Sequence, residues 1–397
     1  MIEREDMNNW KKVRVGDIGK IVTGKTPRTS IQEYYGGSTP FITPSDDMTV
    51  KYIKSTRKKL TTEGKLSVKN CILPKNAICV SCIGSDLGKV VITTEESVTN
   101  QQINSIIVCE EEYDIDFIYY RMKELGKVMN FHSKTSTAVP IINKSQFSDY
   151  TFMCPEKYIQ IRIGEILSAI DGKIANNDAI NRNLSEQAKV LFEEELLKFD
   201  SVPEGWKKGS LSDIADYLNG LAMQKFRSGD DEKGLPVLKI KELRQGSCDA
   251  NSELCSLNIK PEYIIHDGDV IFSWSGSLLV DFWCGGECGL NQHLFKVTSK
   301  KYDKWFYYAW TLYHLDRFIA VAADKATTMG HIKREELSKA EVLIPDSDSY
   351  KRIGEVLGPL YDMIISNRVE NRRLATLRDE LLPMLMSGEM DVSEVEL

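Results

Sequence analysis

Apolar side chains recur at helical spacing along two long stretches of the chain. In residues 156–200, positions 163, 167, 170, 174, 177, 181, 184, 188, 191 and 195 alternate steps of four and three, which is the spacing of a coiled-coil seam. The same positions plus 190 repeat the pattern within residues 346–390. We therefore predict two long amphipathic helices, and about 40 residues at 1.5 Å each give a rod of roughly 60 Å.

Asparagine interrupts each seam at two matching positions. These are Asn177 and Asn181 in the first helix and Asn367 and Asn371 in the second. If the helices are antiparallel and overlap fully, Asn177 faces Asn371 and Asn181 faces Asn367. A slip of one heptad would then leave buried amides unpaired, at about 1–3 kcal/mol each. The pattern predicts that the four amides pair at the centre of the rod and fix the register of the two helices. The alternative is that the four amides face water.

The residues before each helix show a shorter, strand-like pattern. β-Branched runs bounded by Gly, Asp and Asn predict strands at AICVSCIG (77–84), VVITT (90–94) and INSIIVC (103–109). Helical periodicity appears at residues 116–126 and 305–319. Pro155 and Pro345 precede the long helices and end these mixed segments.

The chain is an internal repeat of one module and one helix. NWKKVRVGDIGKIVTG (9–24) resembles GWKKGSLSDIADYLNG (205–220), and RIGEILSAIDGKIANNDAINRNL (162–184) resembles RIGEVLGPLYDMIISNRVENRRL (352–374). We predict module 1 at residues 1–155, a helical spacer at 156–200, module 2 at 201–345, a second spacer at 346–390 and an acidic tail at 391–397.

The short link between the first helix and module 2 determines the helix orientation. Fewer than ten residues separate Leu197 from Trp206, and they span at most about 30 Å. Parallel helices would require the link to return along the whole rod. We therefore expect an α+β protein in which two mixed α/β modules are joined by two antiparallel coiled-coil helices, a dumbbell with a pseudo-twofold axis.

Charge is distributed unevenly along the chain. The net charge is −7, yet residues 1–155 carry 21 Lys/Arg against 18 Asp/Glu. The basic run KYIKSTRKKL (51–60) is either a solvated face or a phosphate-contacting strip. No apolar run approaches membrane-spanning length and the first residues do not resemble a signal peptide. With nine cysteines that have no disulfide or zinc-finger spacing, we expect reduced structural thiols, no metal site and a cytoplasmic location.

The alternating modules and helices resemble the specificity (S) subunit of type I restriction–modification systems. WKKVRVGDIGKIVTGKTP, FITPSDD (41–47), CIGSDLGKV (82–90) and NQQIN (100–104) resemble motifs of its target-recognition domains. The resemblance covers essentially the whole chain. It implies a non-catalytic DNA-binding subunit that holds two adenine-methyltransferase (M) subunits and further restriction (R) subunits on a bipartite double-stranded DNA target. No cofactor is expected in this chain, and S-adenosylmethionine, Mg and ATP would be used by the partner subunits.

Polar loops supply the candidate DNA contacts, because Lys, Arg, Ser, Thr, Asn and Gln serve both phosphate positioning and base readout. Gly24 is expected to allow close backbone approach, and Asn100 is either an adenine-pairing amide or a turn residue. In module 1 the candidates are Thr23, Gly24, Lys25, Thr26, Arg28, Thr43, Ser45, Asp46, Ser85, Lys89, Asn100, Gln101, Gln102, Lys134 and Thr135.

The matching loops of module 2 differ in sequence, so its base preference should differ. For His293 and His331, a surface or internally bonded histidine is the alternative to DNA contact. The candidates are Met223, Lys225, Arg227, Lys239, Ser275, Asn291, Gln292, His293, Lys325, Thr327, Thr328 and His331.

Other functions fit the sequence less well. A methyltransferase would need an Asn/Asp-Pro-Pro-aromatic motif, and no two prolines are adjacent. PSDD (44–47) followed by EGK (63–65) fits a nuclease pattern loosely and has no counterpart in module 2. A structural adaptor with two interaction modules on a coiled-coil spacer is the remaining alternative.

Four apolar residues lie off the helical seam: Ile166, Ile180, Val356 and Met363. They either bind helices of the M subunits or contact the adjacent modules.

Overall fold

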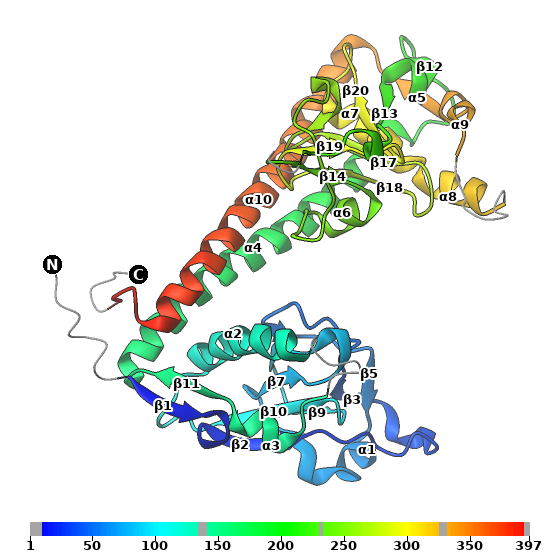
Figure 1. Ribbon diagram of the computed structural model, residues 1–397. Helices are drawn as coiled ribbons and strands as arrows, with labels where there is room; N and C mark the ends of the chain where they lie inside the picture. Colours follow the sequence, from blue (N-terminus) through cyan, green and yellow to red (C-terminus); the bar gives the residue numbers. More distant parts are fainter. Residues whose placement is uncertain (1–9, 134–140, 230–232, 325–331, 393–397) are drawn as a thin grey trace. The chain divides into compact units, whose positions relative to one another are not determined.

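The computed structural model describes residues 10–133, 141–229, 233–324 and 332–392. The chain divides into two compact units, residues 1–172 with 375–397 (unit 1) and residues 173–374 (unit 2). Each unit combines one strand-rich module with parts of two long helices, α4 (Lys157–Leu196) and α10 (Ser347–Ser387) (Figure 1). The fold is of the predicted α+β class, and both helices lie inside the segments in which the heptad pattern was read.

The described residues of unit 1 form three sheets. The five-stranded sheet has the order β2 (Gly19–Thr23), β10 (Ile103–Val108), β7 (Ile78–Ser81), β8 (Val90–Thr93) and β4 (Tyr52–Ile53). The four-stranded sheet has the order β5 (Lys58–Leu60), β3 (Tyr35–Ile42), β9 (Ser97–Thr99) and β6 (Ile72–Leu73). β1 (Lys11–Arg14) pairs with β11 (Thr151–Cys154), and the helices are α1 (Thr62–Leu66), α2 (Ile115–Ser133) and α3 (Lys144–Asp149).

Unit 2 is built in the same way. One sheet has the order β13 (Asp216–Asn219), β20 (Leu294–Thr298), β17 (Val270–Ser273) and β18 (Leu279–Phe282). The other has the order β15 (Leu254–Cys255), β14 (Leu235–Leu238), β19 (Cys288–Leu290) and β16 (Ile264–Ile265). β12 (Lys207–Ser210) pairs with β21 (Glu341–Ile344), and the helices are α5 (Leu211–Ile214), α6 (Ile240–Gln245), α7 (Lys304–Tyr313), α8 (Leu315–Asp324) and α9 (Arg334–Ser338).

The sequence repeat is therefore a structural repeat. The order β2-β10-β7-β8 corresponds to β13-β20-β17-β18, and the parallel pair β3–β9 corresponds to β14–β19. In each module a two-stranded ribbon joins the first strand to the strand that precedes the long helix. Because the ribbon closes the module on itself, each module starts and ends beside its own helix.

The helix predicted at residues 305–319 is interrupted in the structure. α7 ends at Tyr313 and α8 begins at Leu315. Between them His314 is buried, and its Nε2 lies 2.8 Å from the carbonyl oxygen of Glu341. A tertiary contact of this kind leaves no trace in the periodicity.

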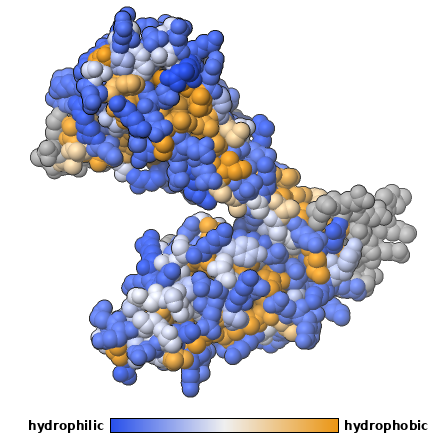
Figure 2. Space-filling model, turned by 180° about the vertical axis from the view of Figure 1, so that it is seen from behind, coloured by the Kyte–Doolittle hydropathy of each residue, from blue (hydrophilic) through white to orange (hydrophobic). Residues whose placement is uncertain are grey.

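The two long helices contribute to the core of both units. In unit 1, Ile163 and Leu167 of α4 share a core with Leu382 and Leu385 of α10. In unit 2, the helical part of the core includes Phe192, Leu357 and Ile364. The face shown in Figure 2 is largely hydrophilic, with apolar side chains gathered in separate patches on both units. Within the described part of the chain, no helix combines the length and apolarity needed to cross a bilayer.

All nine cysteines are free thiols. Cys79 and Cys82, which form the CVSC segment, are buried in two separate cores of unit 1. No cluster of three or more potential metal ligands occurs among the described residues.

Candidate nucleic-acid interface

The strand ends of module 1 bring several of the predicted loops together. β3 and β9 are parallel and end side by side, with Ile42 opposite Thr99. The amide of Asn100 donates to the carbonyl of Ile42 at 3.1 Å. Thr23, at the end of β2, donates its hydroxyl to Oδ1 of Asn104 at 2.7 Å. Residues 23–28, 43–48 and 100–102 therefore form one surface, which we call loop end 1.

Gly24 permits a close contact inside the protein. A Cβ atom at this position would lie 2.1 Å from the carbonyl oxygen of Asn100. The neighbouring amide of Lys25 donates to the Thr99 carbonyl at 2.9 Å, and the Thr26 hydroxyl donates to Oε1 of Gln101 at 2.7 Å. Gly24 therefore lets two loops of module 1 cross, and the close approach of DNA at this glycine stays a prediction.

Within the NQQ segment only Gln101 is exposed. Asn100 is buried, and its side chain donates to Oε1 of Gln102 at 2.9 Å while accepting from the Gln102 amide at 3.1 Å. These two bonds close the turn that starts β10. Asn100 therefore has the turn role that was the alternative interpretation, and Gln101 is the amide that this turn presents to solvent.

Loop 43–48 is organised around a buried carboxylate. Asp46 accepts hydrogen bonds at 2.7 Å from the amides of Thr43 and Arg57. The hydroxyls of Thr43 and Ser45 lie 2.8 Å apart, and Ser45 is exposed. The carboxylate of Asp46 holds the loop and attaches the basic segment to it, and a DNA contact by this residue stays a prediction.

The basic segment contains two kinds of lysine. Lys51 is half-buried, with Nζ 2.8 Å from Asp116, 2.7 Å from Ser168 and 4.9 Å from the ring centre of Tyr120. It is a structural residue that connects the module to α4. Four other cations are exposed and have no ion pair among the described residues: Lys54, Arg57, Lys58 and Lys59.

Other cationic candidates of module 1 differ in their surroundings. Lys25 and Arg28 are exposed, while Lys89 pairs with Asp86 at 2.6 Å. Lys134, Thr135 and the side chain of Ser85 lie outside the described residues.

Module 2 repeats the frame of loop end 1. A Cβ atom on Gly220 would lie 2.2 Å from the carbonyl oxygen of Asn291, and the amide of Asn291 donates to the Leu238 carbonyl at 3.2 Å. Asn291 is buried and accepts from the His293 amide at 3.2 Å. Residues 219–221, 239–245, 274–277 and 291–293 form this second surface, which we call loop end 2.

His293 is held by its neighbours within loop end 2. Its Nδ1 lies 3.1 Å from the hydroxyl of Ser275, and its Nε2 lies 3.3 Å from the amide nitrogen of Gln292. Trp274 was missed by the sequence analysis, although it stands next to the candidate Ser275. Its indole donates to Oδ1 of Asn219 at 3.0 Å and its ring centre lies 6.1 Å from that of His293. The sequence did contain a signal for Trp274, because this large aromatic residue occupies the position that Cys82 has in the first repeat.

Met223 is removed from the candidates because it is only 2% exposed and packs in a core with Leu235 and Val237. Lys225 and Arg227 are exposed, and Lys239 forms an ion pair with Glu253 at 2.6 Å. Lys325, Thr327, Thr328 and His331 lie outside the described residues.

The four asparagines of the helices pair as predicted. The amide of Asn177 donates to Oδ1 of Asn371 at 2.9 Å, and that of Asn367 donates to Oδ1 of Asn181 at 2.9 Å. The two bonds are equivalent under the 190-residue repeat. Asn177 is 1% exposed and Asn181 is 7% exposed, which excludes the alternative that these two face water.

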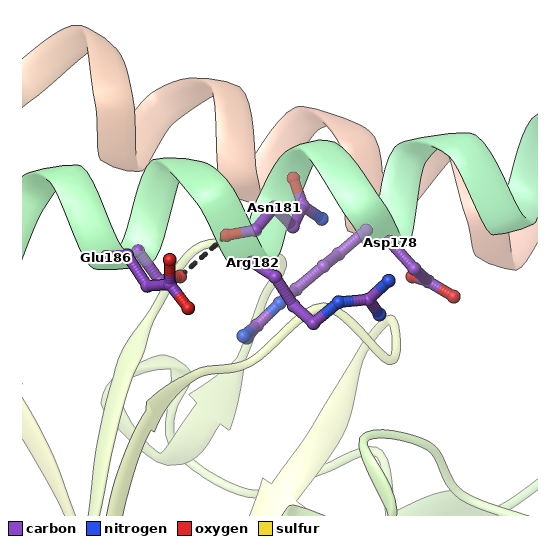
Figure 3. Close-up of a pocket in the computed structure, with 6 residues that line it drawn as sticks. Asp178, Asn181, Arg182 and Glu186 are labelled. Atoms are coloured by element: carbon purple, nitrogen blue, oxygen red, sulfur yellow. Dashed lines mark hydrogen bonds between the residues drawn. The ribbon is translucent and has the colours of Figure 1, made fainter. Parts of the chain in front are cut away.

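The quartet also has neighbours that do not follow the repeat. Asn177 donates to Glu370 at 2.6 Å, and Asn371 donates to Asp178 at 2.8 Å. Beside Asn181 lies a polar hollow of about 420 Å³, into which Figure 3 shows the side chain of Arg182 pointing.

The four off-seam residues do not share one environment. Ile166 packs against the core of unit 1, so for this residue contact with the adjacent module is correct. Ile180 is half-buried. Val356 and Met363 are 48% and 52% exposed on the same helix. Only the last two offer an open apolar surface.

Similarity to known proteins agrees with this architecture. A family model described as the type I restriction modification DNA specificity domain matches residues 7–186 and again residues 203–375. The chain is 26% identical to the type I restriction enzyme MjaIX specificity subunit of Methanocaldococcus jannaschii, over 98% of this chain and 95% of that protein. It is 34% identical to the HindI specificity subunit of Haemophilus influenzae over 46% of this chain and 40% of that protein.

A solved structure, the S subunit of a type I restriction–modification system from M. genitalium, has the same fold. The TM-score is 0.60 at 15% identity, over 97% of this chain and 98% of that chain. With two matches to the domain model that together cover most of its length, the chain belongs to the family of type I restriction–modification specificity subunits.

Proposed function

We propose that each module reads one half of an asymmetric, gapped site in double-stranded DNA. The observation that carries this proposal is the repeated frame of the two loop ends. Gly24 and Gly220 each lie in close contact with the backbone of a turn that begins at an asparagine, Asn100 or Asn291. The exposed side chains around the two turns differ. One backbone frame with two sets of side chains suits two half-sites of different sequence.

The exposed residues of loop end 1 divide by chemistry. Lys54, Arg57, Lys58 and Lys59 form an unpaired basic strip next to loop 43–48, which suits phosphate contacts. Gln101 and Ser45 are exposed on the loops themselves and are suited to base edges. The strip would supply affinity and the loops specificity.

The paired helices would set the distance between the half-sites. The Asn177–Asn371 and Asn181–Asn367 bonds favour one register, because a one-heptad shift sets amides against aliphatic side chains. Val356 and Met363 offer a surface on α10 for helices of two M subunits. Adenine methylation and ATP-dependent restriction would then belong to the M and R subunits, which would use S-adenosylmethionine, Mg and ATP.

Selection from a randomised DNA library tests this proposal. The full chain is assembled with its M subunits, and bound DNA is sequenced after several rounds. We expect two short motifs of different sequence separated by a fixed unspecified gap. A single contiguous motif would contradict the proposal, and DNA bound without any selected sequence would favour the adaptor function.

A further inference from the structure

We propose that α6 is a base-reading helix of module 2 and that Arg244 recognises a guanine in the half-site of that module. This inference rests on the proposed function. It assigns a specificity role to a residue outside the loops that were selected from the sequence.

The position of α6 in the fold is the first argument. The helix starts at the end of β14, and β14 is parallel to β19, so both strands end at loop end 2 (Figure 1). A Cβ atom at Gly276 would lie 3.7 Å from Cδ1 of Ile240. The helix therefore lies against the turn that carries Ser275. At the matching position module 1 has the non-helical loop 43–48, so the two modules would read DNA with different elements.

Internal contacts fix the rotation of α6 about its axis. Glu242 is buried and accepts hydrogen bonds from the amide of Lys239 at 3.3 Å and from the hydroxyl of Ser252 at 3.2 Å. Leu243 is buried in the adjacent core. Residues one and two positions further on, Arg244 and Gln245, are thereby directed outward and are exposed.

The outward face of α6 is cationic and hollowed. A hollow of about 500 Å³ is lined by Ile240, Lys241, Arg244 and Gln245. Lys241 is paired with Asp249 at 3.3 Å. Arg244 forms no ion pair or hydrogen bond with any residue that the structure describes. Its guanidinium is therefore available to a ligand.

The chemistry of that guanidinium indicates the base. An arginine side chain can donate two parallel hydrogen bonds to O6 and N7 of guanine in the major groove, which no other base pair offers in this arrangement. A helix fits the width of the major groove. A lysine can reach the same two acceptors with less geometric selectivity.

The test is selection from the randomised library with the complex of full chain and M subunits. We compare the unmodified chain with R244A and R244K. The control is K300A, since Lys300 is an exposed cation that follows β20 at the end of the sheet away from loop end 2. We expect R244A to lose a guanine at one position of one half-site, with a fall in discrimination of roughly 5- to 150-fold. R244K should keep guanine with weaker preference, and K300A should keep the whole motif.

Two results would overturn the inference. One is an unchanged motif in R244A with binding weakened equally on all sequences, which indicates a phosphate contact. The other is an unchanged motif with unchanged affinity. If the unmodified chain itself selects no two-part motif, the proposed function fails first, so the two failures are distinguishable.

Discussion

Loop ends 1 and 2 have the same backbone frame and different surfaces. In each frame a glycine packs against a turn that begins at an asparagine. The backbone N–H of that asparagine donates a hydrogen bond to the last residue of a neighbouring parallel strand. On this frame module 1 places a loop held by Asp46, whereas module 2 places the helix α6. Under the proposed function, the two modules therefore need not read DNA with corresponding side chains. This holds even though the order β13-β20-β17-β18 repeats that of β2-β10-β7-β8, to which module 1 adds β4.

The attachment of the modules to the helices differs in a similar way. In unit 1, Arg378 of α10 pairs with Asp171 of α4 at 2.7 Å, and the Tyr120 hydroxyl donates to the same carboxylate at 2.7 Å. In unit 2, Arg372 pairs with Asp267 of the module at 2.6 Å, and Arg368 pairs with Asp281 at 2.7 Å. The ion pair of unit 1 is the more buried, with side chains 18% and 14% exposed.

The largest effect is expected from the frame glycine of module 1. In Gly24→Ala the new methyl group would lie 2.1 Å from the Asn100 carbonyl oxygen, so backbone atoms would have to shift to accommodate it. We expect a loss of stability of up to about 3 kcal/mol and loss of one half-site from the selected motif. Gly172→Ala is the control, because a Cβ there meets nothing within 4 Å and should add up to about 1 kcal/mol of helix stability. Retention of both half-sites in Gly24→Ala would show that the frame does not position the loops.

The next largest effect concerns the ion pairs. Arg378→Met leaves the Asp171 carboxylate without its cation in a mostly buried position, which should cost about 2–3 kcal/mol. Arg372→Met removes a pair whose side chains are about twice as exposed, so a cost near 1 kcal/mol is expected. Hydrogen–deuterium exchange of each unit measures both. Equal costs would indicate that burial does not distinguish the two attachments.

Replacing the quartet Asn177, Asn181, Asn367 and Asn371 with leucine should raise stability. A buried polar cluster replaced by apolar side chains of similar size is often stabilising, here by about 2 kcal/mol. The account also predicts a broader range of accepted gap lengths in the DNA selection, since the register is no longer fixed by amide pairs. Urea unfolding measures the stability, and an unchanged gap in the leucine variant would remove the register role.

A smaller effect depends on pH. The hydrogen bond from Arg372 holds the pKa of Asp267 below its ordinary value. A lowered folded-state pKa contributes stability above the unfolded pKa of about 3.9, and this contribution is lost as the pH falls through the folded value. Asp267→Asn should therefore be less stable at pH 7 by at most about 1 kcal/mol, and the difference should disappear as the pH falls through the lowered pKa of Asp267. A difference that persists in acid would point to packing and not to charge.

The basic strip should affect affinity without affecting stability. Lys58→Gln with Lys59→Gln should lower the slope of log affinity against log salt by about two, with the selected motif unchanged. Lys75→Gln is the control, because Lys75 is exposed and precedes β7 at the end of the sheet opposite loop end 1. A changed motif in the double variant would assign these lysines to base recognition.

Much of the architecture could be predicted from the sequence, because it follows from periodicity. The heptad seam predicts both helices, and their antiparallel arrangement with full overlap predicts that Asn177 faces Asn371, which the structure confirms. The repeat predicts the order of the modules, and the short link to module 2 predicts that the helices are antiparallel. Single features that lack a period were not predictable, such as the break at His314 and the helix α6.

Candidate residues were harder to predict because polar loop residues serve the protein as well as a ligand. Asp46 and Asn100 are residue types that often contact DNA. In this structure their side chains accept hydrogen bonds from backbone amides of their own loops. Met223 was placed on a loop by its position in the repeat and is buried in a core. Arg244 could not be predicted, because the helix α6 that directs it outward has only six residues, too few to show a helical periodicity.

The most direct measurement of the central claim is the methylation pattern of DNA from a host that expresses this chain with its M subunits. The account predicts N6-methyladenine in one two-part motif, with different bases in the two halves and a constant gap between them. Exchange of residues 201–345 for the same module of a relative should change one half and leave the other half and the gap intact. Methylation at one contiguous motif, or a change in both halves on exchanging one module, would contradict the account.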